Sequence, residues 1–381
     1  MTTLQPSPPG LELLAYLSLP QLCGQLIVVG FDGAVVPEEL MVDLAAGHRA
    51  GVILFKRNLT SLESTWMLCR QVLSVCDARL PPLIAVDQEG GRVTRLPPPI
   101  RSLPSMRRLA ALDDVQLVER AAEWVAKGLC ALGFNCNFAP VLDVDSNPLN
   151  PVIGDRSFSN EPHQVAHYGL AFARGLGRGG VLACGKHFPG HGDTLCDSHL
   201  ELPVVSRTLD VLERVELLPF REAVSRSIDA LMTAHVVFPE LDPSLPATLS
   251  RTIITGLLRT RWGYDGLVIS DDLDMGAIRQ GYSLQAGAVA AIRAGCDIVL
   301  VCHSLQQAGL VLDALVSEAE CDPVFSERIC ESARRSLSAR LRCPPRPATQ
   351  LAAAEHVLLG ASAQQLFDEV ELRLARTATK Q

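Results

Sequence analysis

Short apolar runs alternate with amphipathic segments along most of the chain. Eight runs are rich in aliphatic and β-branched residues, and they span 24–31, 51–55, 82–87, 134–144, 181–188, 230–235, 266–271 and 296–302. They are nearly continuous in their apolar character, which is typical of strands buried on both faces of a parallel sheet. The segments between them show helical spacing, as in Leu305, Ala308, Leu312 and Leu315, and one long helix is predicted over 107–132.

Eight strand–helix units favour an α/β fold, a single (β/α)8 barrel of the TIM type. An open doubly wound sheet more often has roughly five to seven strands, and no glycine-rich phosphate loop follows the first run. We expect a lead-in over residues 1–18, the barrel domain over 19–343 and a short helical C-terminal extension over 344–381. The extension begins with PPRPAT and continues rich in Ala, Leu and Glu. It is expected to pack on the barrel or to mediate self-association.

Composition narrows the class of protein. The 381 residues are 48% apolar and carry a net charge of −8, which argues against a disordered chain and against a nucleic-acid partner. Twelve cysteines include no C-x-x-C pair, so we predict buried thiols in a reducing compartment. The chain has no apolar run of about 18 residues, and residues 1–10 do not resemble a signal peptide. These features predict a cytoplasmic protein without a membrane partner.

Polar residues stand at the carboxyl ends of five different apolar runs. They are Asp87, Asp143, His187, His235 and Asp271. In a barrel these strand ends converge on one mouth, where active sites are found. The pattern therefore predicts an active site built from several strands.

The densest polar cluster is KHFPGHGDT at 186–194, followed by Asp197, Ser198 and His199. Its proline and glycines preclude a regular helix, so we expect a strand end that runs into a loop. Asp197 and His199 are two positions apart, which puts both side chains on one side of an extended segment. An adjacent carboxylate orients an imidazole and favours its charged form. His199 is therefore a candidate proton donor and acceptor.

Two carboxylate-rich segments complete the candidate chemistry. In SDDLDM at 270–275, a carboxylate at a strand end can attack an anomeric carbon, and Asp271 is closest to that end. Spacing alone leaves the choice open, although helix N-capping is the expected role of Asp272 and Asp274.

The segment DQEGGRV at 87–93 offers Asp87 as an acceptor for sugar hydroxyls, whereas Glu89 and Arg92 are expected to pair with each other. In the segment GDRS at 154–157, the guanidinium of Arg156 can donate hydrogen bonds to a polar substrate, and Asp155 is expected to orient Arg156.

The motifs DQEGGRV, APVLDV, IGDRSF, KHFPGHGDT with DSH, MTAH and SDDLDMGA occur in that order. Together they resemble the β-N-acetylhexosaminidases of glycoside hydrolase family 3, of the NagZ type, from about residue 18 to about residue 320. The resemblance implies a retaining exo-glycosidase that hydrolyses terminal non-reducing β-linked N-acetylglucosamine. Members of this kind typically recycle peptidoglycan in the bacterial cytoplasm by trimming muropeptides. A small carbohydrate is thus the implied partner, and no cofactor or metal is implied.

The resemblance also implies roles for individual residues. Asp271 corresponds to the nucleophile, and His199 corresponds to the acid/base with Asp197 as its partner. The implied substrate-binding residues are Asp87, Arg156, Lys186, His187 and His191.

The sequence leaves several alternatives open. The acetamide of the substrate could act as the nucleophile with help from adjacent carboxylates, another β-sugar could be preferred, or phosphate could replace water as the acceptor. A metal-dependent barrel hydrolase could use His187, His191, His199, His235 and Asp271 as ligands. An amidohydrolase of that kind would carry an H-x-H pair after the first strand, where this chain has Gly30-Phe31-Asp32. A non-catalytic sugar-binding barrel is a third possibility. The sequence does not predict the oligomeric state or a role for Cys196.

Overall fold

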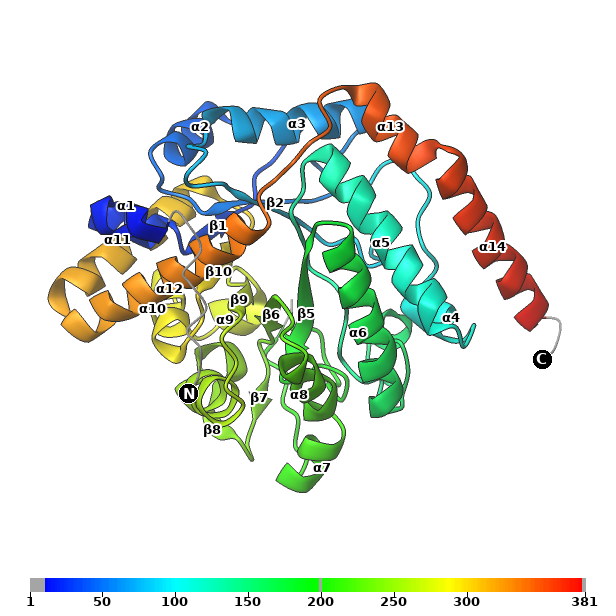
Figure 1. Cartoon of the computed structure of the whole chain (residues 1–381). Coiled ribbons are helices and arrows are strands. Elements are labelled where there is room, and N and C mark those ends of the chain that lie inside the picture. The colour runs from blue at the N-terminus through cyan, green and yellow to red at the C-terminus, as the bar shows by residue number, and fades with distance from the viewer. Residues whose placement is uncertain (1–10, 199–200, 379–381) are drawn as a thin grey trace, which may run out of the picture.

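The computed structural model describes residues 11–198 and 201–378, and within them eight parallel strands close into a barrel (Figure 1). Around the barrel these are β1 (Ile27–Val29), β2 (Gly51–Leu54), β3 (Leu83–Val86), β4 (Cys136–Asn137), β5 (Leu182–Phe188), β6 (Ala230–Thr233), β9 (Leu267–Asp272) and β10 (Ile298–Val301). β10 pairs with β1, with Val28 opposite Leu300, and closes the circle. Each strand overlaps one of the eight apolar runs, so the predicted (β/α)8 barrel is confirmed.

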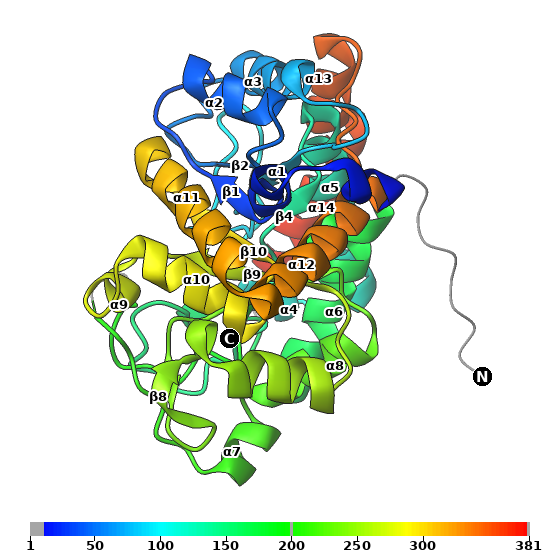
Figure 2. The same ribbon diagram turned by 90° about the vertical axis from the view of Figure 1, so that its left-hand side faces the viewer.

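A short antiparallel ribbon, β7 (Val237–Phe238) and β8 (Asp242–Pro246), follows β6. Helices surround the barrel (Figure 2). In chain order they are η1 (Leu11–Tyr16), α1 (Leu19–Gly24), α2 (Glu38–Ala45), α3 (Leu62–Val75), α4 (Met106–Ala110), α5 (Val115–Leu132), η2 (Gly154–Arg156), α6 (Pro162–Arg178), α7 (Leu209–Arg214), α8 (Leu217–Ser225), η3 (Ala247–Leu249), η4 (Thr252–Arg261), α9 (Gly276–Arg279), α10 (Leu284–Ala294), α11 (Leu305–Cys321), α12 (Pro323–Arg342), α13 (Leu351–Leu359) and α14 (Ala361–Ala378).

The helix predicted over 107–132 is in fact two helices, α4 and α5. The break occurs where Asp113 adopts a left-handed backbone conformation with φ of 49°. Asp114 then caps α5, because its carboxylate accepts a hydrogen bond of 2.9 Å from the backbone N–H of Leu117. In the described part of the chain, no helix is both long and apolar enough to cross a membrane.

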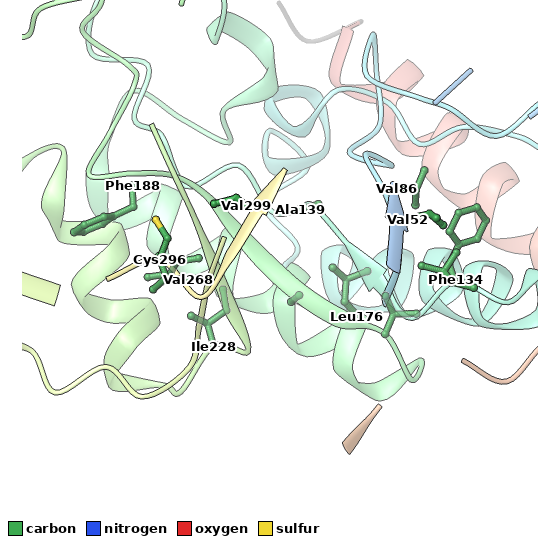
Figure 3. Close-up of a cluster of buried hydrophobic side chains, with 14 of the residues drawn as sticks. Val52, Val86, Phe134, Ala139, Leu176, Phe188, Ile228, Val268, Cys296 and Val299 are labelled. Carbon is green, nitrogen blue, oxygen red and sulfur yellow. The ribbon is translucent and has the colours of Figure 1, made fainter. Parts of the chain in front are cut away.

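The core has two shells, because successive strand residues point to opposite faces. Val28, Ile53, Ala85, Cys184, Met232 and Ile269 belong to the cluster inside the barrel. Their neighbours along the strands, which include Val29, Val52, Val86 and Val268, belong to the larger cluster between the strands and the helices, part of which is labelled in Figure 3. Both shells are apolar, which explains why the strands read as continuous apolar runs.

The thiols largely follow the sequence prediction. Of the six cysteines inside apolar segments, Cys130 is half-buried and the other five are buried, namely Cys23, Cys69, Cys184, Cys296 and Cys302. Cys321 and Cys330, which lie outside those segments, are exposed, and all twelve thiols are free.

The C-terminal extension forms α13 and α14, which lie beside α5 at the edge of the molecule (Figure 1). Phe367 of α14 meets Trp124 of α5 edge to face, with ring centroids 4.8 Å apart. Two ion pairs flank this contact, Arg120 with Glu369 at 2.9 Å and Arg373 with Asp114 at 2.5 Å. The C-terminal extension therefore packs on the barrel, which is one of the two arrangements expected from the sequence.

A buried arginine closes the end of the barrel where the strands begin. Arg340 of α12 is 1% exposed. Its guanidinium donates to the carbonyl oxygens of Ala50 and Pro81 at 3.2 and 2.9 Å and to Oε1 of Gln25 at 2.8 Å. Burial lowers the pKa of Arg340 to about 10, which still leaves the side chain charged at neutral pH. These acceptors lie one or two positions before the starts of β1, β2 and β3, so one cation links three strand starts.

Candidate active site

A cavity of about 490 Å³ opens at the carboxyl ends of the strands. Its size falls in the range of small-molecule sites, about 300–1,000 Å³. Six of the predicted site residues line it, namely Asp87, Arg156, Lys186, His187, His191 and Asp271. Ser198, which follows the predicted Asp197, lines it as well. His199 lies outside the described residues.

A buried ion-pair network forms one wall of the cavity, with Glu89 at its centre. The guanidinium of Arg156 donates two hydrogen bonds to the Glu89 carboxylate, at 2.8 and 2.9 Å. The Lys186 ammonium lies 2.6 Å from Glu89 and 2.7 Å from Asp87. Burial opposes the charge of Glu89, but Arg156 and Lys186 outweigh it and hold the pKa of Glu89 well below its usual range. The wall therefore stays charged, and its ionised donors and acceptors can form strong hydrogen bonds with a polar ligand.

The network corrects two expectations from the sequence. Glu89 does not pair with Arg92, and Asp155 does not orient Arg156. Arg92 instead donates to the carbonyl oxygens of Val152 and Ile153, and its Nε lies 3.8 Å from Asp155. Glu89 pairs instead with Arg156, which lies 67 positions away in the chain. Nearness in sequence gave no sign of that pairing.

His187 is held from behind by a fully buried carboxylate. Asp143 Oδ2 lies 2.6 Å from Nδ1 of His187, and Asp143 Oδ1 accepts hydrogen bonds from the backbone N–H groups of His187 and His191. Burial opposes the charge of Asp143, but the two histidines and these hydrogen bonds lower its pKa. Since Nδ1 is engaged by Asp143, the ring is oriented by a group that does not itself line the cavity.

Asp271 is the penultimate residue of β9 and lines the same cavity as the network. Its Oδ1 accepts a hydrogen bond of 2.8 Å from the backbone N–H of Asp272. Burial opposes ionisation, but His235, His187 and Lys186, together with this backbone N–H, lower the pKa of Asp271. A carboxylate that remains ionised and faces a polar cavity can act as a nucleophile.

Asp272 and Asp274 do not cap the following helix, contrary to the sequence prediction. The residue at the N-cap of α9 is Met275, which makes no side-chain hydrogen bond there. Asp272 Oδ1 instead accepts hydrogen bonds from the backbone N–H groups of Asp274 and Cys302, both at 3.2 Å. Its Oδ2 lies 3.2 Å from Nε2 of His303. Asp272 thus joins the end of β9 to the end of β10.

Sequence reasoning missed several cavity residues. Besides Glu89, these are Arg95, Arg57 and His303. Arg95 lies 3.6 Å from Asp87 Oδ2, and Arg57 donates to the carbonyl oxygens of Phe31 and Cys302. Arg95 follows DQEGGRV by two residues, which was the single available signal. His303 follows an apolar run directly, as the recognised strand-end residues do.

Known proteins resemble this chain over most of its length. The family described as "Glycosyl hydrolase family 3 N terminal domain" matches residues 19–339. A curated β-hexosaminidase from Chromobacterium violaceum is 39% identical over 317 residues, which cover 81% of this chain and 87% of that protein. One from Idiomarina loihiensis is 39% identical over 307 residues, which cover 80% and 91%.

Solved structures agree with these relatives. A glycoside hydrolase family 3 β-N-acetylglucosaminidase from Paenibacillus sp. str. FPU-7 superimposes with a TM-score of 0.87 at 39% identity, over 94% of this chain and 69% of that one. NagZ from Neisseria gonorrhoeae, solved in complex with N-trifluoroacetyl-D-glucosamine, superimposes with a TM-score of 0.75 at 32% identity, over 92% of this chain and 98% of that one.

Proposed function

Since the family match spans residues 19–339, the chain belongs to glycosyl hydrolase family 3, and we propose that it removes terminal non-reducing β-linked N-acetylglucosamine from saccharides. Relatives named β-hexosaminidase, about 39% identical over roughly four fifths of the chain, support this activity. The natural substrates in this proposal are peptidoglycan-derived muropeptides in the cytoplasm. Residues 19–343 form the catalytic domain of the proposal, and 344–381 form a supporting tail.

One observation carries the proposal. Asp271, whose pKa is lowered, and the Asp87–Lys186–Glu89–Arg156 network line one cavity. The network supplies charged donors and acceptors for sugar hydroxyls, and the carboxylate supplies the attacking oxygen. Lys186, Arg156 and Asp87, with His187 beside them, bind the terminal sugar in this proposal. Rigid placement of the sugar next to Asp271 lowers the entropic part of the barrier.

In the first chemical step, a carboxylate oxygen of Asp271 attacks the anomeric carbon. The bond from that carbon to the glycosidic oxygen breaks, and its electron pair stays on the leaving oxygen. His199, partnered by Asp197, gives that oxygen a proton. A glycosyl ester on Asp271 and a neutral alcohol result.

In the second step, His199 takes a proton from water while the water oxygen attacks the same anomeric carbon. The ester bond breaks and returns the electron pair to Asp271. Two inversions leave the sugar in its original β-configuration.

Measurements of substrate preference, covalent trapping, acceptor and metal dependence test the proposal. Chromogenic β-N-acetylglucosaminide, β-glucoside and β-xyloside are compared side by side, and the first is expected to have the highest kcat/KM. A 2-fluoro sugar is expected to leave a stable mass adduct on Asp271. Absence of an adduct together with tight binding of an oxazoline mimic would instead indicate that the substrate's acetamide attacks. Release of sugar 1-phosphate in phosphate buffer would identify phosphate as the acceptor. Loss of activity after treatment with a chelator would indicate a metal-dependent hydrolase.

A further inference from the structure

The loop that follows β5 is anchored to the barrel at one buried serine. Ser198 is 3% exposed, whereas Leu195, three residues earlier, is 70% exposed. The Ser198 hydroxyl lies 3.0 Å from Nε2 of His191. The Ser198 carbonyl accepts a hydrogen bond of 3.1 Å from the backbone N–H of Ala277, in α9. Ser198 therefore contacts both the start of its own loop and the helix that follows the Asp271 turn.

His191 is itself fixed firmly enough to act as the receptor for Ser198. It is 2% exposed, and its backbone N–H donates to Asp143 at 2.7 Å. Its Nδ1 lies 2.8 Å from the hydroxyl of Thr194, and its carbonyl accepts from the side-chain amide of Asn150 at 2.8 Å. Burial lowers the pKa of His191 to about 4, so the ring is neutral at neutral pH. Both ring nitrogens are engaged inside the protein, which suits a structural support better than a substrate contact.

The position of the next glycine adds to this rigidity. A Cβ at Gly192 would lie 1.6 Å from the carbonyl oxygen of Val144, so the loop start is pressed against the chain that follows β4. No other residue fits this close approach without a backbone shift. The loop base, from His191 to Thr194, is thus a fixed platform, and Ser198 is the point where the outer part of the loop returns to it.

We propose that the hydrogen-bonded pair Ser198–His191, here called the loop latch, positions the proton-transfer residues relative to Asp271. This inference rests on the proposed function, because Ser198 stands between Asp197 and His199, the proposed acid/base pair. One tether holds the loop to the base beside His187, and the other holds it to α9, which begins directly after the turn at 271–275. Ser198 and His191 are positioning residues, since they act through their neighbours in the chain.

The latch affects proton transfer more than sugar binding. Misplacement of a catalytic group by about 1 Å can cost roughly 100-fold in rate. A well-placed general acid contributes about 10²–10⁴-fold, and an activated leaving group does not need it. Loss of the latch should therefore be visible in the dependence of rate on the leaving group.

The test compares Ser198→Ala and His191→Asn with the unaltered protein. Asparagine keeps a hydrogen-bonding group near Nδ1 for Thr194 but cannot reach Ser198. Each variant is expected to lose about 10–100-fold in kcat/KM on an alkyl β-N-acetylglucosaminide and less than about 3-fold on the 2,4-dinitrophenyl glycoside. The double variant is expected to lose no more than about 2-fold beyond the worse single variant, because both changes break the same contact.

Ser336→Ala is the matched control. Ser336 is also fully buried and donates one hydrogen bond, at 2.7 Å to the carbonyl oxygen of Gln25, but it lies at the opposite end of the barrel. It reports the stability cost of losing a buried hydroxyl and should show no leaving-group effect. Equal losses on both substrates in Ser198→Ala and His191→Asn, or fully additive losses in the double variant, would overturn the latch.

His199→Ala separates failure of the latch from failure of the proposed function. A leaving-group effect in His199→Ala without one in Ser198→Ala overturns the latch and leaves the acid/base assignment standing. Absence of the effect in His199→Ala overturns the acid/base assignment, and the inference falls with it. A leaving-group effect in Ser198→Ala, His191→Asn and His199→Ala supports both the latch and the acid/base assignment.

Discussion

The carboxylate of Asp143 lies 2.6 Å from Nδ1 of His187, although the two residues are 44 positions apart and Asp143 is fully buried. This contact leaves Nε2 of His187 as the ring nitrogen available to the cavity. The orientation of a proposed substrate-binding residue therefore depends on a side chain that the substrate does not touch.

Replacement of the buried carboxylate tests this dependence. In Asp143→Asn we expect kcat/KM on a β-N-acetylglucosaminide to fall about 10- to 100-fold, because one charge-assisted hydrogen bond is worth about 1.5–3 kcal/mol. Asp145→Asn is the matched control, since Asp145 pairs with Arg107 at 2.7 Å and does not line the cavity. Steady-state kinetics on both variants check the prediction, and an unchanged kcat/KM in Asp143→Asn contradicts it.

Removal of the proposed nucleophile should abolish turnover. Asp271→Asn is expected to lower kcat on activated aryl glycosides by more than about 10³-fold, because an amide cannot form the glycosyl ester. The variant should still fold, since its side-chain oxygen can accept the hydrogen bond from the backbone N–H of Asp272. In Asp271→Ala, added azide should restore turnover and yield the α-glycosyl azide, observable by NMR. Near-normal activity of Asp271→Asn would remove this residue from the nucleophile role.

The network around Glu89 should make stability depend on pH. The pKa of Glu89 is depressed in the folded protein, so its stabilising effect is complete above the unfolded value of about 4.3. That effect disappears as the pH falls toward the folded value. Glu89→Gln, which leaves Arg156 and Lys186 without this partner, should lower the free energy of unfolding by roughly 3 kcal/mol at neutral pH. The difference from the unaltered protein should shrink between about pH 5 and pH 3.

Urea unfolding at several pH values measures this difference. Asp210→Asn serves as the control, because Asp210 forms an exposed pair with Arg214 that is worth less than about 1 kcal/mol. A gap between Glu89→Gln and the unaltered protein that stays constant from pH 7 to pH 3 would show that the Glu89 carboxylate keeps its ordinary pKa.

The C-terminal helices are expected to contribute stability without contributing to catalysis. Phe367 is 3% exposed and contacts Trp124, and the Arg101 guanidinium lies 4.5 Å from its ring centroid. Phe367→Ala should lower the free energy of unfolding by about 3 kcal/mol with kcat/KM unchanged, since α13 and α14 supply no residue to the cavity wall described above. Leu372→Ala, on the same helix but 53% exposed, should change stability by less than about 1 kcal/mol. A large loss of activity in Phe367→Ala would link the tail to the site.

The barrel could be predicted from the sequence because its strands are apolar on both faces. Val28 packs inside the barrel and Val29 outside, so no polar position interrupts the run. The sequence does not predict the break between α4 and α5. The break depends on the left-handed backbone conformation of Asp113, which an aspartate adopts only uncommonly.

The site was recoverable where a strand end marks it, as for Asp87, His187 and Asp271. The ion pairs of the site could not be predicted from the sequence. When the tertiary neighbours of a charged residue are unknown, an opposite charge three positions away is the obvious partner to choose. The sequence favours a pair of Glu89 with Arg92 on that ground, but the partners of Glu89 in the structure are Arg156 and Lys186. Asp143 stands near the end of the apolar run 134–144, in the irregular segment that follows β4, but its partner His187 belongs to β5. Long-range ion pairs are properties of the closed barrel, and local patterns do not encode them.

The cation of Arg340 has a consequence for how the chain is made. All eight strands have been synthesised once residue 301 is added, but the carbonyl groups at the starts of β2 and β3 receive this donor only after about forty further residues. A nascent chain that ends before α12 contains all eight strands but lacks the Arg340 side chain, which links the starts of β1, β2 and β3. Translation must therefore pass residue 339, the end of the family-matched segment, before Arg340 can hold the starts of the strands together.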